Sequence, residues 1–148
     1  MHRVLLRDFP VQLAYEARQH GESLLRELAF IVADGRDDTP VARRLLELAA
    51  HTDEHYAGMN PEADALLDAA HARGDEYVDL DLQVPADFLD TALEAVPVLV
   101  EVDKFCRTGQ LLTLPPSDEL RAFWRWYLGE YIRQIGGEPP VSWRTVQA

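Results

Sequence analysis

Residues 117–135 are the segment that most constrains the fold of this chain. Apolar side chains recur there at spacings of three and four, which indicates one broad apolar stripe along a helix. Ser117 is a typical N-cap, and Asp118 and Glu119 follow in the first turn, where the helix dipole favours anions. Gly136–Gly137 end the pattern. We therefore predict an aromatic helix that anchors a helical core. The stripe consists of Leu120, Phe123, Trp124, Tyr127, Leu128, Tyr131, Ile132 and Ile135.

Four further segments carry helical patterns. Thr39-Pro40 and Asn60-Pro61 each place an N-cap residue before a proline at the first helical position, and Asp8 is a candidate cap before Pro10. Pro97 lies inside the last segment, where a missing backbone hydrogen bond should kink or split the helix. These predicted helices cover 10–33, 40–56, 61–73 and 86–107.

The five helices predict an all-α fold, a five-helix bundle. A chain of 148 residues is long enough to bury a core as one domain without disulfides or metal. We expect a single domain over 1–148, with 1–8 and 138–148 as terminal segments. Helices 10–33, 86–107 and 117–135 should build the core.

Residues 77–84 break the helical pattern. Val78, Leu80, Leu82 and Val84 alternate with polar residues, and a period of two indicates a half-buried strand or extended segment. A single strand cannot satisfy its own backbone groups. Its candidate partners are Val4–Leu6, Leu111–Leu114, or the same strand of a second subunit in a homodimer. The alternative is an extended arm that lies across the helices.

The net charge of −12 is concentrated in the middle of the chain. Residues 53–103 hold fourteen Asp and Glu and one basic residue, Arg73. Such a field repels phosphate backbones, so we expect no nucleic-acid partner. The acidic region is interpreted either as a solvated face or as a docking face for a basic partner. The N-terminus lacks the apolar run of a signal peptide and no window is apolar enough to span a membrane, so the chain is predicted to be cytoplasmic without a membrane partner.

His51-Thr52-Asp53-Glu54-His55 matches the H-x-x-E-H pattern of inverted zinc proteases. Two histidines four residues apart on a helix share a face and can bind one zinc, while Glu54 is placed to activate water. The chain is much shorter than those proteases, and Gly58 ends the helix almost at once. Incidental surface histidines are therefore the main interpretation, and His51, Glu54 and His55 stay the candidates for a metal site.

The polar side of helix 117–135 carries Arg121, Arg125 and Arg133, with Trp126 off the apolar stripe. We predict these four as candidate partner-binding residues. The arginines would contact an acidic partner or the acidic middle of another copy, and Trp126, if exposed, would be an anchor, because Trp is enriched at interface hot spots. Ordinary surface charge, and a core position for Trp126, are the alternatives. Cys106, the only cysteine, is interpreted as a buried, inert thiol. No catalytic residue, phosphate loop or cofactor is predicted.

Two parts of the chain resemble a known group of proteins. Residues 103–134 contain D-x-F-C-R-x-G-x-L-L-T-L followed by F-x-x-W-Y-L-x-E, and similar motifs are F-P-V-Q-L at Phe9–Leu13 and L-L-R-E at Leu24–Glu27. The chain thus resembles small, all-helical actinobacterial domains found with ATP-binding signalling proteins of the anti-sigma-factor-kinase type. The resemblance implies a regulatory or binding role and supplies no catalytic residues. An anti-sigma-type ATP-binding protein is the partner that it implies.

Three functions follow from these patterns. The first is a non-enzymatic regulatory or protein-interaction domain in bacterial cytoplasmic signalling. The second is a zinc-dependent hydrolase that uses the H-x-x-E-H motif. The third is a small-ligand sensor with a pocket between helices, near the kink expected at Pro97.

Overall fold

The computed structural model describes residues 1–34, 40–107 and 112–147, and these form a mainly helical fold with a two-stranded sheet. All five predicted helices and the strand at 77–84 are present, with bounds that differ from the expected ones by at most two residues. The elements are β1 (His2–Pro10), α1 (Val11–Ala33), α2 (Pro40–Tyr56), α3 (Pro61–Arg73), β2 (Tyr77–Val84), α4 (Phe88–Arg107), α5 (Asp118–Ile135) and α6 (Trp143–Gln147).

The strand partner left open by the sequence is β1. It pairs antiparallel with β2, with Val4 opposite Leu82 and Leu6 opposite Leu80. All four of these side chains are buried. The terminal segment 1–8 thus supplies a strand that lies within the core, as one of the candidate pairings required. An open alternative, pairing with Leu111–Leu114, includes a residue outside the described ranges.

A bulge interrupts β1 between Leu6 and Phe9. Asp8 lies there with φ of 52°, in the left-handed region that non-glycine residues rarely adopt. Its backbone N–H donates to the Asp79 carboxylate over 2.8 Å. Asp8 is thus not the cap of α1, which begins after Pro10 with no side-chain cap. The bulge shifts the alternation of buried residues by one position, so Phe9, and not Asp8, follows Leu6 into the core.

The predicted helix caps form only in part, and the Asn60 side chain makes no cap hydrogen bond to α3. Ser117 caps α5 by accepting a hydrogen bond from the Leu120 N–H, and Gly74 ends α3 with φ of 76°. Thr39, the expected cap of α2, lies outside the described residues. Helix α4 continues through Pro97 and is not split. The described residues contain six helices, so the five-helix prediction is wrong by the short α6 near the C-terminus.

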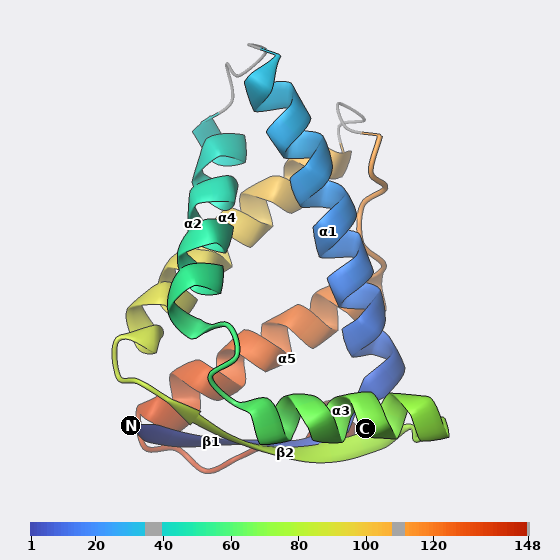
Figure 1. Cartoon of the computed structure of the whole chain (residues 1–148), viewed down its shortest axis with the longest axis vertical. Helices are drawn as coiled ribbons and strands as arrows, with labels where there is room; N and C mark the ends of the chain where they lie inside the picture. The colour runs from blue at the N-terminus through green and yellow to red at the C-terminus, as the bar shows by residue number, and fades with distance from the viewer. Residues whose placement is uncertain (35–39, 108–111, 148) are drawn as a thin grey trace.

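The buried side chains form two separate clusters. Figure 1 shows β1, β2 and α3 at one end of the molecule, with α1 and α2 extending away from it and α5 crossing between. The sheet, α3, α5, α6 and the first half of α1 enclose the cluster at this end, here called the sheet core. The far halves of α1 and α4 pack with α2 in a second cluster, the helix core. The helix core contains Leu24, Leu28, Val41, Ala42, Leu45, Val98, Val102 and Cys106.

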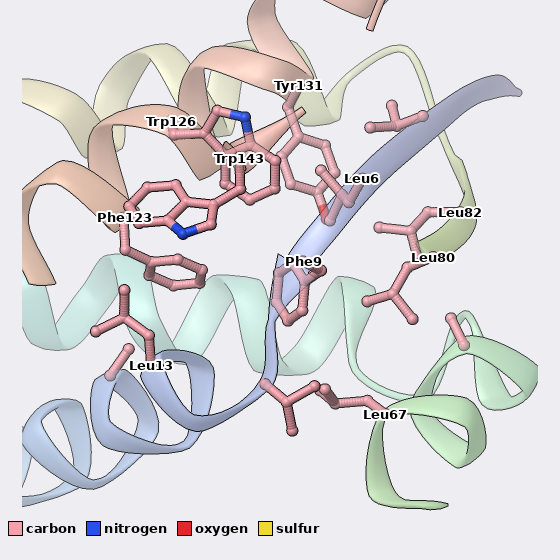
Figure 2. Packing of buried hydrophobic residues seen from close by; sticks show 14 of the residues in the cluster. Leu6, Phe9, Leu13, Leu67, Leu80, Leu82, Phe123, Trp126, Tyr131 and Trp143 are labelled. Carbon is pink, nitrogen blue, oxygen red and sulfur yellow. The ribbon is translucent and has the colours of Figure 1, made fainter. Parts of the chain in front are cut away.

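Aromatic rings dominate the sheet core. Phe9 from β1 projects among the aromatic side chains of α5 and α6 (Figure 2), and its ring centroid is 5.5 Å from that of Phe123. Trp126 packs 5.6 Å from Trp143 and donates its indole N–H to the Val141 carbonyl over 2.8 Å. Such edge-to-face pairs add to the burial of apolar area. The C-terminal segment therefore covers a second side of α5.

No helix among the described residues is long and apolar enough to cross a membrane.

Candidate ligand-binding cavity

A cavity of about 820 Å³ lies between the two cores. Its lining comes from β1, β2 and helices α1–α5, whose arrangement Figure 1 shows. This volume falls within the range of about 300–1,000 Å³ typical of small-molecule sites. The wall is mainly apolar. It includes Leu6, Phe9, Ala17, Leu45, Leu48, Ala49, Leu67, Leu80, Leu82, Phe88, Ala95, Leu99 and Phe123.

Access from solvent bears on what fills this cavity. The space is partly open to solvent, so water or a ligand occupies it. Because water gains little from apolar walls, an apolar ligand that displaces it is favoured.

Two tyrosines from α5 supply polar groups to the wall. The hydroxyls of Tyr127 and Tyr131 are 3.1 Å apart and bond to each other. Burial is the main cause that raises the pKa of both tyrosines, and the Asp64 carboxylate raises both further. The hydroxyls thus remain protonated at neutral pH. One hydrogen of the pair is free to donate to a ligand, since a single bond uses only one.

A second pair of hydroxyls lies on the α2 and α4 side of the wall. The Tyr56 hydroxyl is 3.5 Å from that of Thr91. The Phe88 ring has its centroid 4.8 Å from the rings of both Tyr56 and Tyr131. Phe88 therefore connects the two hydroxyl pairs. The wall combines a large apolar surface with a few hydrogen-bonding groups, as ligand sites do.

The exposed lining residues mark the mouth of the cavity. Arg18 of α1, Asp53 of α2 and Asp64 of α3 line the cavity and are exposed. Asn60, also in the lining, exchanges two hydrogen bonds with the backbone of Gln83 in β2. This contact fixes the connection between α2 and α3 beside the mouth. The charged groups there are one cation and two carboxylates, which disfavour an anionic ligand.

The four predicted partner-binding residues lie outside this cavity. Trp126 is 3% exposed and belongs to the sheet core, so it is not the exposed anchor that the prediction required. Arg121 binds Asp103 and Asp118, and Arg133 binds the fully buried Glu130. Arg125 is exposed, and no ion pair holds it among the described residues. Partner binding by the arginines stays a prediction, and Arg125 is the one most available for it.

The candidate metal residues lie at the exposed end of α2. The rings of His51 and His55 have centroids 4.1 Å apart, and His55 uses Nδ1 in a hydrogen bond with the His51 carbonyl. Glu54 is also exposed. In residues 1–34, 40–107 and 112–147, no three His, Cys, Asp or Glu side chains are grouped so that they could hold a metal ion. This arrangement does not favour a hydrolase.

Cys106 lies in the helix core with 3% of its surface exposed. Burial, assisted by the Asp103 and Glu27 carboxylates, raises the pKa of its thiol. The thiolate needed for nucleophilic attack is therefore scarce at neutral pH. This agrees with an inert core thiol.

Comparison of the chain with family models, with curated proteins and with solved structures finds no match. The cavity is the feature that the sequence patterns indicated least. Tyr127 and Tyr131 fit the apolar stripe and were expected only in the core. The two remaining hydroxyls, of Tyr56 and Thr91, come from segments 35 residues apart. A sequence pattern on either segment does not reveal this pairing.

Proposed function

We propose that this domain binds an uncharged, mainly apolar small molecule in the cavity between its two cores and acts as a ligand sensor. The observation that carries the proposal is the cavity of about 820 Å³ with apolar walls and few polar groups. This is the third function considered from the sequence. Helix α4 contributes Ala95 and Leu99 to the wall, on either side of Pro97.

The polar groups narrow the class of ligand. The protonated hydroxyls of Tyr127 and Tyr131 can donate a hydrogen bond to a carbonyl or ether oxygen. Asp53 and Asp64 at the mouth, and the net charge of −12, oppose the entry of an anion. The ligand is therefore expected to be neutral, with one oxygen acceptor on an otherwise apolar body.

Ligand binding in this place would couple the two cores. The walls belong to the sheet core on one side and to α2, α4 and the far part of α1 on the other. A ligand that touches both would fix their spacing. It would also stabilise the folded state by mass action. A change in the spacing of the helices would change the surface that another protein contacts, and ligand binding would be signalled in this way.

The regulatory role and the anti-sigma-type partner implied by the resemblance remain proposals. An interaction through α5 would depend mainly on Arg125, because the other two arginines of this helix are held in ion pairs within the chain. A sensor could still work through such a partner. The hydrolase receives no support from the geometry around His51 and His55.

A fluorescent probe tests the ligand class. N-Phenyl-1-naphthylamine is neutral and apolar, and 1-anilinonaphthalene-8-sulfonate is a similar molecule with a negative charge. We expect saturable binding of the neutral probe at one site per chain, with a rise in the melting temperature. The anionic probe should bind at least about tenfold more weakly. Absence of saturable binding, or a preference for the anionic probe, would contradict the proposal.

A further inference from the structure

Helix α4 presents an apolar face to solvent as well as one to the core. Its buried side chains include Ala92, Val98 and Val102. On the outer side, Leu93, Val96 and Val100 are 50%, 41% and 51% exposed. We call these three residues the α4 stripe. Scattered apolar residues are normal on a surface, but a row along one helix indicates an interface.

The spacing of the α4 stripe suits a second helix. Leu89 is half-buried and precedes the stripe, and the positions 89, 93, 96 and 100 are separated by four, three and four residues. This is the spacing of the apolar seam between two packed helices. Pro97 lies on the exposed side of α4, so that its ring does not disturb the packing against the core.

Two charges at one edge of the stripe indicate what covers it. Asp90 and Lys104 lie seven residues before and after Pro97, two helical turns in each direction, so they share an edge. Both are exposed, and among the described residues neither has an ion-pair partner. If a second copy of α4 packs antiparallel about a twofold axis at Pro97, Asp90 lies beside Lys104 of that copy. The twofold axis forms this Asp90–Lys104 pair twice, once on each side of Pro97.

A parallel arrangement would form no such pair. A twofold axis along the helices places Asp90 and Lys104 of one copy on the opposite edge of the seam from those of the other copy, so neither charge meets a partner. The remaining acidic residues of the helix, Glu94 and Glu101, lie further from the stripe and stay in solvent in the antiparallel arrangement. The Asp90–Lys104 pair therefore favours a second copy of α4 that packs antiparallel to the first.

We propose that the α4 stripe is the interface of a homodimer, in which two α4 helices pack antiparallel about Pro97. The seam from Leu89 to Val100 is only about 17 Å long. That is small for an obligate dimer, so association should be a reversible equilibrium at micromolar concentration. None of the α4 stripe residues lines the cavity.

Matched leucine substitutions test the interface. Leu93 in α4 and Leu66 in α3 are both 50% exposed. Sedimentation velocity over about 5–500 µM protein should show a monomer–dimer equilibrium for the wild type. The salt concentration should be about 0.15 M, where charge repulsion between acidic copies is screened beyond about 8 Å. Leu93→Glu should weaken dimerisation by at least about tenfold, because it buries a charge in the seam. Leu66→Glu should leave it unchanged. A wild type that stays monomeric throughout, or equal effects of the two variants, would overturn the proposal.

A charge exchange tests the direction of packing. Asp90→Lys and Lys104→Asp should each weaken dimerisation several-fold, because each places like charges side by side. The double variant D90K/K104D restores opposite charges and should recover the wild-type association. Circular dichroism confirms that each variant is folded. Failure of the double variant to recover association would rule out the antiparallel register.

Discussion

At the scale of single residues, one carboxylate binds the backbone ahead of α5. Glu27 of α1 accepts hydrogen bonds from the backbone N–H groups of Leu112 and Thr113 and from the Thr113 hydroxyl. Partial burial raises the pKa of Glu27, but these three hydrogen bonds lower it by more, so the net pKa lies below its ordinary value of 4.5. The carboxylate thus secures the start of the segment that leads into α5.

The Glu27 contact predicts a dependence of stability on pH. Because the folded-state pKa is lowered, the carboxylate stabilises the fold above pH 4.5 and loses this effect as pH falls through the folded-state pKa. Glu27→Gln should therefore be less stable than the wild type at pH 7, and the difference should shrink below pH 4.5. Urea unfolding at several pH values measures it. Glu22→Gln, an exposed glutamate of the same helix, is the control. A difference that does not change with pH would contradict this role.

At the scale of elements, both edges of the small sheet are closed by side-chain amides. Gln134 of α5 donates to the Leu5 carbonyl and accepts from the Leu5 N–H, each over 2.8 Å. Asn60 makes the same pair of bonds to Gln83, at 2.8 and 3.1 Å. An isolated two-stranded sheet is marginal in water, and its open edges invite pairing with other chains. The two amides replace the missing neighbour strands locally.

Removing either amide should destabilise the sheet. Gln134→Ala leaves a partly buried peptide group of β1 without partners, and we expect a loss of about 1–3 kcal/mol in the free energy of unfolding. Asn60→Ala should cost less, because its bonds are exposed. Gln12→Ala, at an exposed position of α1, is the control for losing an amide side chain. Chemical denaturation measures all three. Equal stability of Gln134→Ala and Gln12→Ala would contradict the closing role of Gln134.

The two strands and Trp126 show what the sequence could and could not predict. The alternation in 77–84 is regular, so β2 was predicted with its bounds. In β1 the bulge at Asp8 shifts the pattern between Leu6 and Phe9, which hides the period of two. Trp126 has the core position that the sequence left open as an alternative, for another reason. It lies off the stripe of α5, and it is buried only because Trp143 and Val141 of the C-terminal segment return to cover it. Such contacts between distant segments leave no local pattern.

At the scale of the whole molecule, two cores meet around a cavity. The predicted stripe of 117–135 and the alternation of 77–84 supply part of the sheet core: Leu80, Leu82, Val84, Leu120, Phe123 and Tyr131. A pocket between helices was only the third alternative, because the volume of a cavity depends on how far apart α1, α2, α4 and α5 are held. The sheet core sets that spacing at one end and the helix core at the other. The central claim is that this space is a binding site for a neutral ligand.

One measurement tests that claim most directly. Ala49 of α2 lines the cavity, whereas the next residue, Ala50, is exposed and does not. Ala49→Trp should fill part of the cavity and Ala50→Trp should not, although both add the same side chain to the same helix. Titration with N-phenyl-1-naphthylamine, with circular dichroism to confirm folding, compares the two variants with the wild type. We predict that Ala49→Trp lowers the affinity for the probe by at least about tenfold while Ala50→Trp retains it. Equal affinity of two folded variants would show that the probe binds elsewhere and would contradict a ligand site between the cores.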